Sequence, residues 1–203
     1  MTTEGEDSTV SPQIPDREDD GIKKLTTDNW LEGDDILRAF VRLDATGKRS
    51  ALTKEVLAQG FLSIELSPDV PSEIQTLFRT ARGVLLYGVF FYPLYIVGLG
   101  KISRTAEAAV ARRFKDLGGP KKRETFAARL EWLHQNGHLT DEEKFIWDTI
   151  RRDRNETAHP SYQMVQPPAD LVRDLRVVAH CIGCLFDRSV VFTSLWTDGR
   201  VRR

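Results

Sequence analysis

Apolar residues recur at helical spacing along most of this chain from about residue 28. After Pro167 and Pro168 they are spaced four, three, four and three residues apart, at Leu171, Leu175, Val178, Ile182 and Leu185. Residues with that spacing lie on one face of an α-helix. Comparable patterns predict helices within 28–43, 52–64, 71–92, 93–117, 124–133 and 141–158. Because β-branched runs are scarce elsewhere, the pattern indicates an all-α fold, a bundle of about six or seven helices.

Prolines and one capping pattern indicate where several of these helices begin. Pro71 lies near the first turn of one predicted helix, and Pro167 and Pro168 open the last one, positions that proline favours. Pro93 starts or kinks another helix, which ends at the Leu-Gly-Gly-Pro stretch from residue 117. Thr140 and Glu143 form a capping-box pattern that opens the helix at 141.

Residues 84–100 form an uncharged stretch of seventeen residues between Arg82 and Lys101. A membrane span needs about 20 apolar residues, and this stretch contains a proline and three glycines. Two core helices that meet near Pro93 are the favoured interpretation. A membrane span and a dimer interface are the alternatives, since the aromatic residues of this stretch exceed what one small core must cover.

Charge divides the chain more sharply than its net value of −1 indicates. Residues 1–20 contain seven acids and one base, whereas residues 101–203 contain 19 bases and 14 acids. The polar, acidic first segment is predicted to be a disordered tail. The predicted division is therefore a tail at 1–20, an N-terminal helical extension at 21–80 and a helical domain at 81–203. The basic excess indicates some affinity for polyanions, less than a dedicated duplex-DNA binder shows.

The cysteine and histidine patterns do not predict a metal or a cofactor. The two cysteines, Cys181 and Cys184, lie on one helical stripe without a second pair, so they are interpreted as small core residues. Gly137 interrupts the helix between His134 and His138, which favours a loop there. With so few cysteines and no secretory signal, the sequence predicts a cytoplasmic protein.

Candidate chemistry is concentrated at residues 151–160, with the sequence RRDRNETAHP. Arg151, Asn155 and His159 are spaced four residues apart, and Pro160 disfavours helical geometry at His159, so the helix should end at about Ala158. Basic residues are favoured at any helix C-terminus, which is the functionless alternative. The functional alternative is RNA transesterification, in which histidine transfers protons and arginine binds the phosphate without a metal.

The stretch RNETAHP resembles the R-(polar)-x(3–5)-H signature of HEPN domains (higher eukaryotes and prokaryotes nucleotide-binding). Arg154 matches the signature arginine, Asn155 the polar residue and His159 the histidine. The segments 92–114 and 125–139 are similar to the family's earlier core helices, so the resemblance covers about residues 80–190. It implies a HEPN-like bundle that dimerises with both motifs in one cleft.

The resemblance also implies an activity and its partners. Many members are metal-independent endoribonucleases that leave 2′,3′-cyclic phosphate ends and act as toxins, in antiphage (antiviral) defence or in RNA processing. Others are non-catalytic modules that bind RNA, a nucleotide or a protein partner, which remains the alternative here. RNA, a second copy of the chain and an antitoxin or defence protein are therefore the predicted partners, with no membrane.

Roles follow for individual residues. His159 is the predicted general base or acid, Arg154 binds the phosphate and the transition state, and Asn155 orients them. RNA-guiding residues are predicted from the remaining bases, which are equally compatible with plain solvated charge: Arg151, Arg152, Lys121, Lys122 and Arg123. Glu107 is a predicted partner of Arg154, with a salt bridge to another residue as the equal alternative. In one toxin subgroup a tyrosine two residues after the histidine is adenylylated, whereas Tyr162 lies three residues after His159.

Overall fold

The computed structural model describes residues 21–43, 46–122, 125–157 and 166–187, without the side chains of residues 42–43 and 153–157. Its elements are the 3-10 helix η1 (Asp35–Ala39), strands β1 (Val41–Leu43) and β2 (Arg49–Ala51), and helices α1 (Lys54–Leu62), α2 (Ser72–Tyr87), α3 (Leu94–Asp116), α4 (Phe126–Gln135), α5 (Asp141–Thr157) and α6 (Pro168–Phe186). The predicted all-α fold is confirmed, with six α-helices in these residues. The predicted tail at 1–20 lies outside them.

Local capping explains where most of these helices begin. Pro71, Pro93 and Pro167 immediately precede α2, α3 and α6, as predicted. The hydroxyl oxygens of Thr53 and Thr125 accept hydrogen bonds from backbone N–H groups in the first turns of α1 and α4. Each cap satisfies a donor that the helix itself leaves without a partner.

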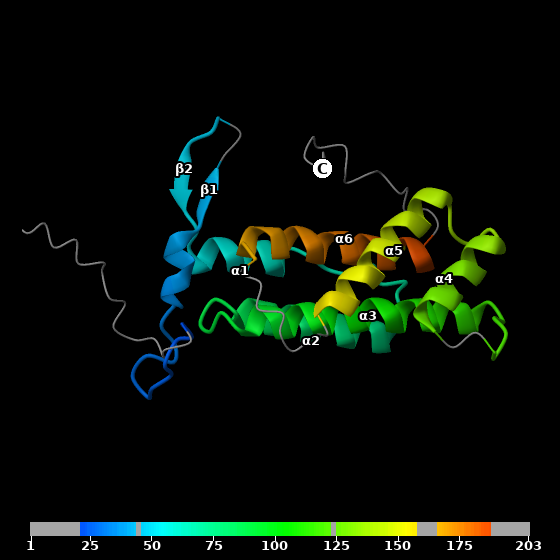
Figure 1. Ribbon diagram of the computed structural model, residues 1–203, viewed down its shortest axis with the longest axis horizontal. Helices are drawn as coiled ribbons and strands as arrows, with labels where there is room; N and C mark the ends of the chain where they lie inside the picture. The colour runs from blue at the N-terminus through cyan, green and yellow to red at the C-terminus, as the bar shows by residue number, and fades with distance from the viewer. Residues whose placement is uncertain (1–20, 44–45, 123–124, 158–165, 188–203) are drawn as a thin grey trace, which may run out of the picture.

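Helix α3 is the centre of the bundle. It packs against α2, α4, α5 and α6, and α1 bridges α2 and α6. In Figure 1, α2 and α3 form one layer, α1 and α6 lie above them, and α5 crosses α3 obliquely next to α4. Ala106 and Ala109 of α3 have no exposed surface, so neighbouring helices can approach its backbone closely.

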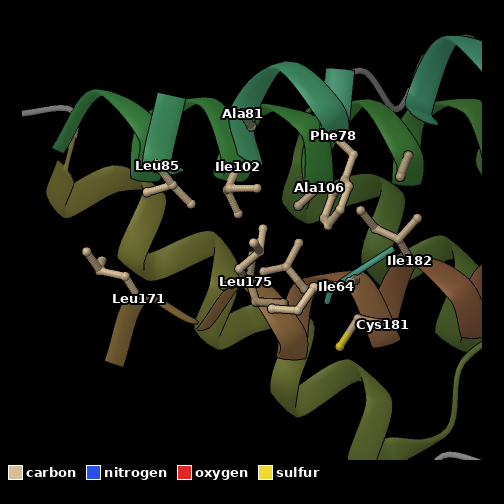
Figure 2. Close-up of a cluster of buried hydrophobic side chains, with 14 of the residues drawn as sticks. Ile64, Phe78, Ala81, Leu85, Ile102, Ala106, Leu171, Leu175, Cys181 and Ile182 are labelled. Carbon is tan, nitrogen blue, oxygen red and sulfur yellow. The ribbon is translucent and has the colours of Figure 1, made fainter. Parts of the chain in front are cut away.

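The core lies between the α2–α3 layer and α6. Figure 2 shows Phe78, Leu85 and Ile102 pointing toward Leu175 and Ile182 of α6. The apolar stripe predicted for the last helix is confirmed, because all five of its residues are at most 5% exposed: Leu171, Leu175, Val178, Ile182 and Leu185.

The helix predicted at 28–43 is wrong. Residues 27–31 form turns, η1 spans only five residues, and β1 pairs antiparallel with β2, Val41 opposite Ala51. Asp34 caps η1 through its hydrogen bond from the Ile36 N–H. Gly47, with φ of +80°, lies in the connection between the strands. The apolar spacing of residues 36–41 is satisfied by a short helix followed by a strand, which a single helical pattern does not distinguish.

Two buried charges hold this N-terminal region against the bundle. The Lys23 ammonium donates hydrogen bonds to the carbonyls of Asn29, Glu32 and Phe90, at 2.9, 2.8 and 3.2 Å. A carboxylate oxygen of Asp34 accepts a hydrogen bond from the Tyr92 N–H at 2.8 Å. Both side chains thus connect residues 21–40 to the turn between α2 and α3. Charged groups at such buried positions require these bonds.

Residues 84–100 are the end of α2, a turn and the start of α3, as the favoured interpretation predicted. No helix in the described ranges combines the length and apolar character that a membrane crossing requires. The predicted division between residues 80 and 81 falls inside α2, and one apolar core extends from Leu37 to Leu185 across it. The extension and the helical domain therefore share a core.

Two glycines of α3 test the close packing against α2. A Cβ atom at Gly98 would lie 2.5 Å from Cδ2 of the buried Leu85, whereas one at Gly100 would meet no atom within 4 Å. We expect Gly98→Ala to lower the free energy of unfolding by about 1–3 kcal/mol through overpacking. Gly100→Ala should raise it by up to about 1 kcal/mol through helix propensity. Equal changes in urea denaturation would contradict this account.

Candidate functional site

Helix α5 positions the candidate site, and its first turn is firmly capped. The Thr140 N–H donates to a carboxylate oxygen of Glu143 at 2.7 Å, and the Glu143 N–H donates to the Thr140 hydroxyl oxygen at 3.2 Å. This reciprocal pair confirms the predicted capping box. Glu143 is only 4% exposed, so the box lies within the bundle. The direction of α5 is therefore fixed at its start.

Burial along α5 then orients its far end. Ile146, Trp147 and Ile150 are buried, and α5 packs against α3, α4 and α6. The helix ends at Thr157, close to the predicted end at Ala158. Positions 154 and 155 are therefore in its last turn, and Figure 1 shows that turn over the middle of α3.

The three predicted catalytic residues differ in how far the structure describes them. Arg154 and Asn155 belong to α5, but their side chains lie outside the description. His159 and Tyr162 lie outside the described residues altogether, as does Arg123. Their assigned roles remain predictions. Glu107, the predicted partner of Arg154, is half-buried on α3, the helix that α5 crosses.

Arg151 is engaged within the protein. Its Nε donates to a carboxylate oxygen of Asp148 at 3.2 Å, and Lys144 bonds the other Asp148 oxygen at 3.0 Å. Lys144 also lies 3.4 Å from a carboxylate oxygen of Glu131 on α4. We call these four residues the ion chain. The two negative and two positive charges of the ion chain sum to zero, so little of the Arg151 charge is left to attract a substrate.

The ion chain also changes the acidity of its members. Burial raises the pKa of Asp148, but hydrogen bonds from Lys144 and Arg151 outweigh it and leave that pKa lower than usual. The hydrogen bond to Asp148 raises the pKa of Lys144. Both shifts favour the charged forms that the chain requires.

Arg152 has no such counter-charge among the side chains that the structure describes. Its Nε donates to the Asp148 carbonyl at 3.3 Å, and one Nη donates to the Thr149 hydroxyl at 3.4 Å. Both acceptors are neutral, and the side chain is exposed. Of the two α5 arginines predicted to guide RNA, Arg151 is paired with a described carboxylate, whereas Arg152 is exposed and bonds only neutral groups among the described side chains.

Lys121 and Lys122, also predicted to guide RNA, lie elsewhere. They are exposed in the connection between α3 and α4. Figure 1 places that connection at the end of the bundle away from the last turn of α5. The structure therefore does not bring these lysines and the α5 arginines into one patch, although their own role stays a prediction.

The cysteine and histidine residues that the structure describes do not form a metal site. Cys181 and Cys184 are buried and form no disulfide with each other, and burial raises the pKa of the Cys181 thiol to about 12. Figure 2 shows the Cys181 sulfur beside apolar side chains. His134 bonds a carboxylate oxygen of Asp141 at 2.7 Å. Across the described residues, no three His, Cys, Asp or Glu side chains are grouped to hold a metal ion.

Sequence reasoning missed a cleft in the N-terminal region. It has a volume of about 890 Å³ and lies where η1, the β-hairpin and the start of α1 meet. Arg49 and Lys54 line it together with Asp35, which pairs with Arg38 at 3.0 Å. The Thr46-Gly47 pair between two short strands was the available hairpin signal. The hairpin was not predicted because residues 28–43 were assigned to a helix.

Comparisons with known proteins do not identify a relative. No family model, no curated protein and no solved structure matches this chain.

The ion chain predicts a component of acid sensitivity. Because the folded-state pKa of Asp148 is lowered, its contribution to stability is present above the unfolded pKa of about 3.9 and is lost as pH falls through the folded value. Asp148→Asn should be less stable than wild type at neutral pH, and the difference should shrink below about pH 4. Urea midpoints across this pH range measure the effect.

The matched control is Asp28→Asn, which changes an exposed carboxylate in an N-terminal turn. It should keep the wild-type dependence of stability on pH. A constant difference between Asp148→Asn and wild type from neutral to acid pH would contradict the assigned ion pairs.

Proposed function

We propose that this protein is a metal-independent endoribonuclease that cleaves RNA by attack of a ribose 2′-OH on the adjacent phosphate. One observation carries the proposal. Capping and burial fix α5, and its last turn carries Arg154 and Asn155, with His159 two residues beyond its end. A helix end is a rigid support for groups that must converge on a phosphate. The resemblance to the HEPN signature supports the same assignment.

Each residue has a distinct part in the proposed reaction. The His159 imidazole accepts the proton of the attacking 2′-OH or donates one to the departing 5′-oxygen. Arg154 binds the phosphate oxygens, on which negative charge develops as the 2′-oxygen bonds to phosphorus. Asn155 orients the imidazole or a phosphate oxygen. The products are a 2′,3′-cyclic phosphate and a 5′-hydroxyl.

A two-fold dimer completes the proposed site. Each chain supplies one histidine of this motif, whereas the reaction uses a base and an acid. A symmetric interface would place the same residue of both copies in one cleft. A toxin or antiphage-defence setting, with an antitoxin or defence protein as partner, suits such an activity.

The alternative is a non-catalytic module that binds RNA, a nucleotide or a protein partner. The cleft of about 890 Å³ is the observation in its favour, because its volume lies within the range of ligand-binding pockets. In that case the residues at 154–159 would contribute binding or helix-end stability without turnover.

The decisive experiment is cleavage of a mixed pool of tRNA and single-stranded RNA in the presence of EDTA. We expect wild type to produce 2′,3′-cyclic phosphate ends, and His159→Ala to lower the rate by about 10²–10⁴-fold through loss of proton transfer. Arg154→Ala should lower it by about 10²–10³-fold through loss of charge stabilisation. Light scattering on the same samples measures the oligomeric state.

His138→Ala is the matched control, because it removes a half-buried histidine outside the proposed site. It should cleave as wild type does. Equal cleavage by wild type and His159→Ala would identify a contaminating nuclease and overturn the proposal. Binding without cleavage by wild type would favour the alternative module.

A further inference from the structure

Helix α5 presents an outward face on which an aromatic ring and a cation lie in line. Phe145 is 67% exposed and makes no ring contact with another described residue. Thr149 and Arg152 follow it at intervals of four and three residues. Seven residues complete almost two helical turns, so Phe145 and Arg152 lie on the same face, about 10 Å apart along the axis. We call these three residues the outer stripe.

The outer stripe differs from the ion chain beside it. In the ion chain, Lys144 and Arg151 are compensated by carboxylates. In the outer stripe, Thr149 donates to the Phe145 carbonyl at 3.0 Å and accepts from Arg152 at 3.4 Å. No carboxylate whose side chain the structure describes forms an ion pair with Arg152. The charges of the ion chain are therefore paired within the protein. The outer stripe, on the neighbouring face of α5, exposes the Arg152 guanidinium and the Phe145 ring to solvent.

The ligand that combines negative charge with flat aromatic groups is a single-stranded nucleic acid. Its bases stack on exposed aromatic side chains, and its phosphates bind arginine. In a duplex the bases are stacked on each other, so an exposed ring gains little from them. The stripe leads toward the last turn of α5, where position 155 follows Arg152 by three residues and so lies on the same side of the helix. At its other end, the exposed acid Glu142 disfavours phosphate beyond Phe145.

We infer that the outer stripe is the surface along which single-stranded RNA enters the site, with a base stacked on Phe145 and a phosphate bound by Arg152. The inference rests on the proposed function, because it names how that site receives its substrate. Phe145 and Arg152 are binding residues here and have no part in proton transfer. Arg151, predicted from the sequence to guide RNA, is instead retained by Asp148.

Binding is measured with an RNA that cannot react. A fluorescent single-stranded 12-mer with 2′-O-methyl riboses has no 2′-OH to attack, so its affinity is independent of turnover. We expect Phe145→Ala to weaken binding by roughly 5- to 100-fold through loss of base stacking. Arg152→Gln should weaken it and reduce the slope of log affinity against log salt by about 0.7, the value for one phosphate contact. Arg151→Gln should leave that slope unchanged.

Matched controls come from α2. Leu77→Ala removes a side chain that is 45% exposed. Arg79→Gln removes an exposed arginine that, like Arg152, bonds the threonine three residues before it at 3.4 Å. Both should bind as wild type does, and the fully 2′-O-methylated duplex of the same sequence should bind more weakly than the single strand. Circular dichroism verifies that each variant keeps its helical content.

The outcomes separate this inference from the proposed function. Three results would each overturn the inference that the outer stripe binds single-stranded RNA. They are wild-type affinity in Phe145→Ala, equal binding of the duplex and the single strand, and no binding by wild type. If Phe145 and Arg152 govern binding but unmodified RNA is not cleaved, the inference holds and the endoribonuclease proposal fails. If His159→Ala abolishes cleavage while Phe145→Ala leaves binding unchanged, the endoribonuclease proposal holds and the inference about the outer stripe fails.

Discussion

The fold depends on one constraint, which is that four helices must reach the same central helix. Helix α3 meets α2, α4, α5 and α6 along 23 residues. Such approaches are possible because its inward positions are small: Gly98 admits Leu85, and Ala106 and Ala109 are fully covered. Larger side chains there would separate the helices and lose the dense packing that the core requires. The orientation of α5 depends on this contact.

The N-terminal region depends on the bundle in a different way. Its two strands are three residues each, and an isolated two-stranded hairpin is marginal in water. The buried Lys23 and Asp34 attach the residues before the hairpin to the bundle, by hydrogen bonds to the backbone of the turn that joins α2 and α3. The stability that the hairpin does not have by itself comes from this attachment. The cleft beside the hairpin therefore has one wall that is fixed to the central layer.

The sequence predicted the elements whose signals are local. The capping box at Thr140, the prolines before α2, α3 and α6, and the apolar stripe of α6 each specify structure within a few residues, and all are confirmed. The region 28–43 could not be predicted in this way. Its structure depends on bonds between residues separated by 58 and 67 positions, and no periodic pattern encodes such pairs.

The same distinction applies to the candidate site. The place of Arg154 in the last helical turn follows from Pro160 and local geometry, so it was predictable. Whether an arginine is paired depends on its rotamer, because Asp148 lies three residues before Arg151 and four before Arg152, and both spacings permit a contact. Arg151 and Arg152 are adjacent in the sequence and equally basic, yet only Arg151 joins the chain that reaches Glu131 on α4.

This difference between two neighbouring arginines separates helix stability from function. Partial negative charge at a helix C-terminus is stabilised by cations in the last turn. Arg151 lies before the last turn of α5 and is paired with Asp148, so its role is within the ion chain. Arg152 repeats the charge without a carboxylate, and Phe145 leaves a large apolar surface in water, which folding alone does not favour. One ligand that stacks on Phe145 and binds Arg152, as we propose for single-stranded RNA, would account for the exposure of both side chains.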